Sequence, residues 1–252
     1  LAYLLPLLDD ILCEKANAAS KSEDHIPLPS YDYARAFILV PNKELVQQVL
    51  RMAVPLCGGT AIEETIVWAP GNSIDYLHGQ LGPSSAMGNT EKTDPSEVIR
   101  LAVMPGGLKE PLDFKPFRDS IGFGGRNLPV DIVVTTPAAL GPLGLPPKYI
   151  NMFADVSTVV IDEADMLLDG GYLRALENVL IGFRRADRLV DKDSIDVSMK
   201  RTQHVFVAAT LPDMGLKSVD SYLQRKFPHA NRIVTNDMHN AKHYGLSQPT
   251  KW

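Results

Sequence analysis

Apolar residues along this chain fall into short runs, and helical patterns separate the runs. Mainly apolar runs of strand length occupy residues 36–40, 98–104, 131–135, 158–162 and 204–209. Such runs are typical of strands buried on both faces of a parallel sheet. Helical patterns cover residues 1–15, 42–56, 138–140, 172–185 and 219–227. Because strands alternate with helices, the pattern predicts an α/β fold with a doubly wound, mainly parallel sheet and right-handed crossovers.

The segments between these elements are mostly polar. Residues 16–35 are predicted to be a loop and residues 186–202 a charged connector, while 65–69 and 233–235 are weaker strand candidates. Residues 60–97 are predicted to form a mobile insertion, because their second half is rich in Gly, Pro, Ser, Asn and Thr.

Composition narrows the possible functions. The 252 residues are 45% hydrophobic and 22% charged, which fits one large or two small globular domains. The net charge of −5 excludes a strongly basic nucleic-acid module, so any RNA contact must come from a local patch. Cys13 and Cys57 are too few for a disulfide framework, which favours a reducing compartment. The apolar stretch 1–12 is too short to span a bilayer, and no membrane partner is predicted.

Acidic residues come directly after the run at 158–161. Asp162 and Glu163 fall where the predicted strand ends, and Asp165 lies two positions later. Ligands bind at the carboxyl ends of strands in open α/β sheets. Acids at that edge can hold a divalent cation and polarise a water molecule. The alternative is a strand that runs into a solvated acidic turn.

The sequence Val-Val-Ile-Asp-Glu-Ala-Asp at 159–165 resembles motif II of the DEAD-box ATP-dependent RNA helicases. The resemblance implies the first RecA-like domain of a P-loop ATPase, with ATP and Mg²⁺ as its ligands. It also implies that Asp162 holds Mg²⁺ and that Glu163 orients or deprotonates the hydrolytic water. Asp165 would link the nucleotide site to the strand that bears Thr210.

Four further elements resemble the family's motifs in order and spacing, although each alone fits an ordinary strand end or turn. Three of them are the elements implied to contact RNA. Pro41-Asn42-Lys43-Glu44 resembles motif Ia, which usually reads Pro-Thr-Arg-Glu, and Gly106-Gly107 matches the Gly-Gly element. Thr136-Pro137 resembles motif Ib, with Ala138 and Ala139 at its usual Gly and Arg positions. The resemblance implies that these elements hold the RNA backbone without sequence readout.

The run 205–210 ends in Ala208-Ala209-Thr210 and resembles motif III, usually Ser-Ala-Thr, which couples hydrolysis to strand separation in the family. This Ala-Ala-Thr form and the tail from Phe227 bear a faint likeness to plant organellar members.

The chain contains no Gly-x-x-x-x-Gly-Lys-Ser/Thr loop for the nucleotide phosphates. Its opening Leu-Ala-Tyr-Leu-Leu-Pro-Leu-Leu resembles the segment immediately after that loop in the family, so we expect a truncation just before Leu1. Residues 1–235 would then be a partial helicase ATP-binding domain, and 236–252 a polar tail or the start of an interdomain linker. The second RecA-like domain would lie outside the chain.

A sheet that is incomplete at the N-terminus has consequences for folding. We expect two strands to face a gap or to close over it, leaving unpaired edges. Such a fragment would neither bind ATP tightly nor unwind RNA, and it would fold poorly.

Two alternative functions stay open. The altered motifs Ia, Ib and III favour a catalytically inactive RNA-binding or scaffold protein derived from a DEAD-box helicase, whereas the intact Asp162-Glu163-Ala164-Asp165 disfavours it. Another P-loop nucleoside triphosphatase, such as a DNA helicase, fits the Gly-Gly and Thr-Pro elements less well. The location is expected to be intracellular, with nucleus, cytoplasm, plastid and mitochondrion all open.

Overall fold

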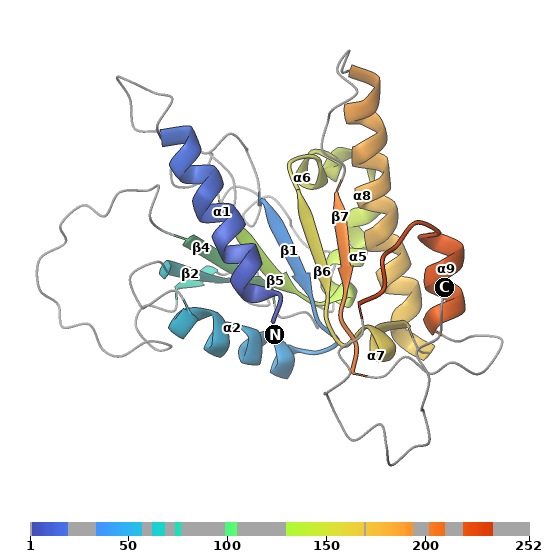
Figure 1. Ribbon diagram of the computed structural model, residues 1–252, viewed down its shortest axis with the longest axis horizontal. Helices are drawn as coiled ribbons and strands as arrows, with labels where there is room; N and C mark the ends of the chain where they lie inside the picture. The colour runs from blue at the N-terminus through green and yellow to red at the C-terminus, as the bar shows by residue number, and fades with distance from the viewer. Residues whose placement is uncertain are drawn as a thin grey trace, which may run out of the picture. The chain divides into compact units, whose positions relative to one another are not determined.

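Seven strands form one continuous hydrogen-bonded sheet in the order β3-β2-β4-β5-β1-β6-β7 (Figure 1). The computed structural model describes residues 2–19, 34–56, 62–68, 74–76, 99–104, 130–168, 170–193, 202–209 and 219–233. The strands are β1 (Ala36–Leu39), β2 (Ile62–Trp68), β3 (Ile74–Tyr76), β4 (Ile99–Met104), β5 (Ile132–Thr135), β6 (Thr158–Ile161) and β7 (Gln203–Phe206). Every pairing is parallel except that of β2 with β3, which confirms the predicted α/β class and mainly parallel sheet.

Strand β1 lies inside the sheet, where it pairs with β5 on one side and β6 on the other. Its four residues are buried on both faces, as the continuous apolar run predicts. The described strands leave no gap, because β6 pairs directly with β7 and β7 ends the series. Of the two expected alternatives, strands that face a gap and strands that close over it, the described strands show the second.

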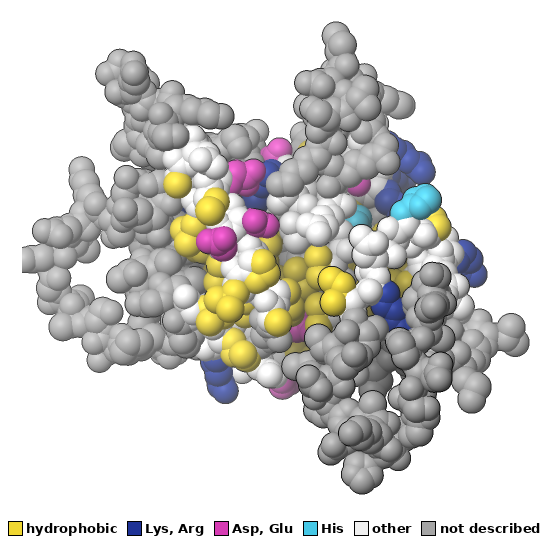
Figure 2. Space-filling view, viewed as in Figure 1, with side chains coloured by type: hydrophobic (Ala, Val, Ile, Leu, Met, Phe, Trp, Pro, Cys, Tyr) yellow, Lys and Arg dark blue, Asp and Glu magenta, His cyan; other side chains and the backbone are white. Residues whose placement is uncertain are grey.

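Two helices cover one face of the sheet. They are α1 (Leu4–Ala19) and α2 (Lys43–Leu56), and their inward leucines and valines pack on alternate residues of the strands. On β1 these are Ala36 and Ile38. Figure 2 shows hydrophobic side chains gathered around the first half of α1, with acidic side chains farther along it. Such burial of apolar surface is the main source of stability for this layer.

Ion pairs fix α1 at its C-terminal half. Lys15 donates to the carboxylate of Asp131 at 2.7 Å, and both side chains are buried. Arg35 pairs with Glu14 and also donates to the backbone oxygen of Asp155 at 3.1 Å. These contacts tie α1 to the residues that precede β5 and β1, at the amino ends of the strands.

The opposite face is covered by α5 (Pro137–Gly144), α6 (Asn151–Ala154) and α8 (Leu173–Asp193). An aromatic cluster forms its centre: Phe153 stacks with Phe37 at 6.3 Å and meets Phe183 edge-on at 4.9 Å. Small residues let α5 and α8 approach closely, since a Cβ added at Gly144 would lie 2.2 Å from the Asn178 carbonyl oxygen. Helices on both faces confirm the doubly wound arrangement.

Several elements differ from the predictions. The helix predicted over 172–185 continues to Asp193, so the expected connector is helical over 186–193. The short elements β3, α6, α7 (Ala164–Leu168), η1 (Pro147–Tyr149) and η2 (Gly170–Tyr172) were not predicted. The predicted insertion and tail lie largely outside the described residues, although β2 and β3 within 60–97 belong to the sheet.

The chain divides into two units, Leu1–Thr210 and Leu211–Trp252. The described part of the second unit consists of α9 (Val219–Lys226) and the turn after it. Ile233, part of a weak strand candidate, lies in no strand and is 90% exposed. Among the described helices, none is both long and apolar enough to cross a membrane.

Candidate functional site

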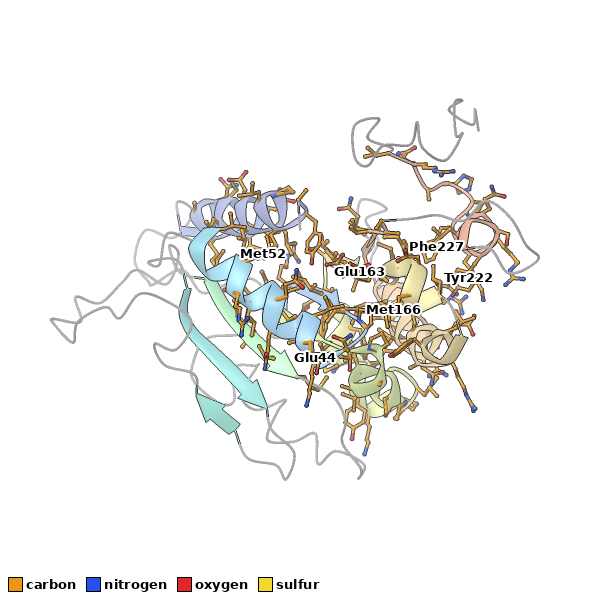
Figure 3. The ribbon with its side chains drawn as sticks, turned by 90° about the horizontal axis from the view of Figure 1, so that it is seen from below. Glu44, Met52, Glu163, Met166, Tyr222 and Phe227 are labelled. Carbon is orange, nitrogen blue, oxygen red and sulfur yellow. The ribbon has the colours of Figure 1, made fainter. Side chains whose placement is uncertain are left out.

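The acidic turn between β6 and α7 lies at the carboxyl edge of the sheet, between its two neighbouring strands. The backbone N–H of Asp162 donates to the carbonyl oxygen of Leu39 at the end of β1, at 2.9 Å. The N–H of Ala164 donates to the carbonyl oxygen of Val207, just beyond β7, at 2.8 Å. Figure 3 views this edge from below, with Glu163 and Met166 near the start of α7. Backbone hydrogen bonds to both sides therefore fix the place of the two acids.

The Asp162 carboxylate is held by a donor on each oxygen. Its Oδ2 accepts a hydrogen bond from the Tyr3 hydroxyl at 2.7 Å, and its Oδ1 accepts one from the backbone N–H of Glu163 at 3.0 Å. Burial, the charge of Asp162 and this hydrogen bond raise the pKa of the Tyr3 hydroxyl well above its usual range. The phenol is therefore a protonated donor to the carboxylate.

Glu163 occupies an unusual backbone conformation with a φ of 50°. A residue with a Cβ rarely adopts this left-handed region, and such strain is concentrated at functional sites. The side chain is half-buried. Partial burial, and then repulsion from Asp162 and Asp165, raises the pKa of the Glu163 carboxyl. A carboxylate with a raised pKa is a better proton acceptor.

Asp165 lies in the first turn of α7, where its Oδ1 accepts a hydrogen bond from the N–H of Met166 at 3.0 Å. A negative charge in the first turn of a helix interacts favourably with the helix dipole. The predicted link from Asp165 to Thr210 cannot be traced, because Thr210 lies outside the described residues.

The turn that resembles motif Ia connects β1 to α2. Asn42 caps α2, because its Oδ1 accepts a hydrogen bond from the Leu45 N–H at 2.9 Å. Pro41 is buried, whereas Lys43 and Glu44 are exposed in the first turn of the helix. Figure 3 shows Glu44 at this end of α2.

The turn that resembles motif Ib connects β5 to α5. Thr136 is buried and caps α5 through its Oγ1, which accepts a hydrogen bond from the Ala139 N–H at 3.3 Å, and Pro137 takes the first helical position. Ala138 is exposed, but Ala139, at the position of the family's Arg, is only 4% exposed.

The turns of motifs Ia and Ib lie next to each other. β1 and β5 are neighbours in the sheet, and the Val40 N–H donates to the Thr135 carbonyl oxygen at 3.0 Å. Because β1 also pairs with β6, both turns share the sheet edge that holds Asp162.

The segment that resembles motif III continues β7. The Val207 N–H donates to the Ile161 carbonyl oxygen at 2.9 Å, so this segment stays paired with the strand that leads to Asp162. Ala208 is half-buried and Ala209 is exposed. Gly106 and Gly107, like Thr210, lie outside the described residues.

The acids fit a magnesium ion of the kind that accompanies a nucleotide. Within the described residues, no three His, Cys, Asp or Glu side chains gather as a metal site. Mg²⁺ does not need such a group, because it usually binds one or two carboxylates together with water and phosphate oxygens. Asp162 offers one half-buried carboxylate at the edge of the sheet.

Sequence reasoning missed two roles. The apolar pattern places Tyr3 only in the stripe of the first helix, although a buried tyrosine hydroxyl usually needs a polar partner. The motif resemblance assigns Asn42 only to the contact with the RNA backbone, although Asn before a helix is a common cap.

Comparisons with known proteins indicate the family of this chain. Residues 107–219 match the family DEAD/DEAH box helicase. The probable ATP-dependent RNA helicase DDX28 of Homo sapiens is 29% identical over 84% of this chain and 29% of its own length. The mitochondrial ATP-dependent RNA helicase mrh4 of Neurospora crassa is 32% identical over 84% of this chain and 24% of its own length. The chain thus spans less than a third of the length of these relatives.

Among solved structures, the yeast DEAD-box splicing factor Prp28 overlaps 78% of this chain and 31% of its own, with a TM-score of 0.41 and 20% identity. The fold assignment rests instead on the strand order and registers of the sheet. The matched residues 107–219 include the acidic turn, and both relatives are named ATP-dependent RNA helicases. The chain therefore carries a DEAD/DEAH box helicase domain, in the part that forms the first RecA-like region of such helicases.

Proposed function

We propose that this chain supplies one half of the ATP site of an ATP-dependent RNA helicase, in which RNA-stimulated hydrolysis drives unwinding or remodelling of RNA–protein complexes. One observation carries the proposal: Asp162 and Glu163 lie at the carboxyl edge of the sheet, between β1 and the extension of β7. The turns of motifs Ia and Ib share that edge. An arrangement of this kind can couple nucleotide chemistry to a neighbouring RNA surface.

In this mechanism each acid has a distinct role. Asp162 would hold Mg²⁺, which neutralises charge on the ATP phosphates when bound. Glu163 orients the attacking water and accepts its proton at the carboxylate, a role that its raised pKa supports. Asp165 would connect the site to Ala208-Ala209-Thr210 and so to the coupling of hydrolysis with strand separation.

The RNA backbone would cross the turns before α2 and α5. Backbone N–H groups at helix N-termini bind phosphates well. The proposed contacts are Pro41, Asn42, Lys43, Glu44, Gly106, Gly107, Thr136 and Pro137. Lys43 is exposed and can pair with a phosphate as a point charge. Because the contacts are to the backbone, binding would not depend on RNA sequence.

A second candidate is an RNA-binding scaffold that no longer hydrolyses ATP. The buried Ala139 favours it, because the position of the family's arginine offers no cation to a phosphate. The absence of the serine hydroxyl at Ala208 favours it as well. Turnover of ATP decides between the two candidates.

The proposed full-length protein is longer than this chain. The chain spans less than a third of the length of its relatives, so we propose that a phosphate-binding loop and a second RecA-like domain complete the ATP site. The fungal relatives are named mitochondrial helicases, and we propose the same organelle here. Imaging of the tagged full-length protein tests the location, and a purely nuclear signal would contradict it.

The proposed catalytic role is tested by Glu163→Gln in the full-length protein. This change removes the proton acceptor but keeps the size of the side chain, so ATP turnover with RNA should fall by about 10²- to 10⁴-fold. ATP-dependent RNA binding should persist. Glu177→Gln is the matched control, since Glu177 lies on α8 and should leave turnover unchanged. Unchanged turnover in Glu163→Gln would refute the role of this residue.

A further inference from the structure

Tyr3 connects the helical layer to the acidic turn. Its ring packs against the hydrophobic core beside α1, while its hydroxyl donates to Asp162 Oδ2 at 2.7 Å. The two residues are 159 positions apart in the chain. The contact is therefore tertiary, and its geometry depends on where α1 places the ring.

Contacts along the whole length of α1 hold Tyr3, which directly precedes the helix, in its position. Leu4, the next residue, is fully buried, and the later inward residues of the helix pack on the strands and α2. At the other end, the buried pair of Lys15 and Asp131 ties the helix to the start of β5. A helix held in this way presents the phenol from a constant direction.

The two hydrogen bonds to Asp162 together set the plane of its carboxylate. The Glu163 N–H holds Oδ1 and the Tyr3 hydroxyl holds Oδ2. A carboxylate has about four acceptor sites, so both oxygens keep lone pairs for a cation or its water. Without the hydroxyl, the second oxygen would lose its donor and the carboxylate could rotate about its terminal torsion, which is broad for Asp.

We propose that Tyr3 is a positioning residue for the reaction, whose hydroxyl holds the Asp162 carboxylate in the orientation that receives the magnesium ion of the bound nucleotide. This inference rests on the proposed function. Tyr3 touches neither the metal nor the nucleotide in this role and acts through Asp162 alone. Partners that orient a metal ligand typically contribute about 10- to 100-fold to metal affinity. A carboxylate that contacts Mg²⁺ largely through water should lie at the low end, about tenfold.

The test uses Tyr3→Phe in the full-length protein, because phenylalanine keeps the ring and removes only the hydroxyl. The Kd of a fluorescent ADP analogue is measured with Mg²⁺ and again with EDTA. We expect Tyr3→Phe to weaken binding about tenfold with Mg²⁺ and to leave the Kd in EDTA within about twofold of the wild type. Tyr149→Phe, which removes a hydroxyl from η1, is the matched control and should change neither value.

The outcomes separate the inference from the proposed function. If the wild type binds the analogue more tightly with Mg²⁺ and Tyr3→Phe behaves identically, the inference is overturned and the proposed function stands. Equal losses with Mg²⁺ and with EDTA would assign Tyr3 a purely structural role and also overturn it. A wild type whose affinity is insensitive to Mg²⁺ would overturn both. If Tyr3→Phe does not fold, Tyr3→Leu must show the same magnesium-selective loss, and an unselective loss refutes the inference.

Discussion

The close approach of α5 to α8 makes Gly144 the most sensitive small residue of the described fold. A Cβ at Gly144 would lie 2.2 Å from the carbonyl oxygen of Asn178 and 2.9 Å from its carbonyl carbon, whereas ordinary contact begins at 3.4 Å. Both neighbours are backbone atoms, so no side chain can rotate away. The substitution Gly144→Ala must therefore push the two helices apart.

The expected cost combines packing and helix propensity. Overpacking a core costs about 1–3 kcal/mol, and a clash with rigid backbone belongs at the upper end. Alanine recovers up to about 1 kcal/mol of helix propensity over glycine. We expect Gly144→Ala to lower the free energy of unfolding by about 2 kcal/mol. Because Thr136, a proposed RNA contact, caps α5, RNA affinity should fall as well.

Urea denaturation of the full-length protein measures this effect, with Gly171→Ala as the matched control. A Cβ at Gly171 has no heavy atom within 4 Å, so this variant should be neutral or slightly stabilising. Gly141→Ala should be intermediate, since its nearest contact is 3.0 Å. Equal stabilities of the Gly144 and Gly171 variants would refute the packing argument.

Two further predictions concern ionisable side chains that are removed from solvent. Burial, with a smaller effect of Arg184, holds the pKa of His204 below its ordinary value of 6.5, and Asp187 only partly opposes this. The unfolded chain therefore binds the proton more readily, so the stabilising contribution of neutral His204 should be fully present above about pH 6.5 and should be lost as the pH falls below it. The urea midpoints measured at pH 7.5 and pH 5.5 should differ less in His204→Gln than in the wild type. Lys15→Met should lower the free energy of unfolding by about 3–5 kcal/mol, because the buried carboxylate of Asp131 loses its counter-charge. The double variant Lys15→Met with Asp131→Asn should recover most of this loss. Wild-type stability of Lys15→Met alone would contradict the argument.

The central strands could be predicted from the sequence because burial on both faces leaves a continuous apolar signal. The runs at 36–40, 131–135 and 158–162 match β1, β5 and β6 within about one residue. The three-residue β3 depends on its antiparallel partner β2, and α7 has five residues, so neither carries a periodic pattern of its own.

The extension of α8 to Asp193 was also not predicted, because its local sequence does not indicate a helix. Its last two turns are highly charged, which favours a connector, yet tertiary contacts hold part of this segment. Ala186 is fully buried, and Asp187 accepts hydrogen bonds from the N–H and hydroxyl of Thr202 just before β7. Contacts outside the local pattern thus stabilise the beginning of this extension.

The candidate site, too, has local features that the sequence predicts and tertiary features that it does not. The identities of Asp162, Glu163 and Asp165 could be predicted, because a motif is a local feature of the sequence. The left-handed backbone of Glu163 and the hydrogen bond from Tyr3 could not, since they arise from the turn geometry and from the packing of α1.

The central claim is that Asp162 and Glu163 serve ATP hydrolysis that responds to RNA. Phosphate release by the full-length wild-type protein, measured with and without single-stranded RNA at saturating ATP and Mg²⁺, tests this claim most directly. The account predicts hydrolysis that rises with RNA and does not depend on its sequence. Tight RNA binding without ATP hydrolysis would contradict it and would identify the protein as a scaffold.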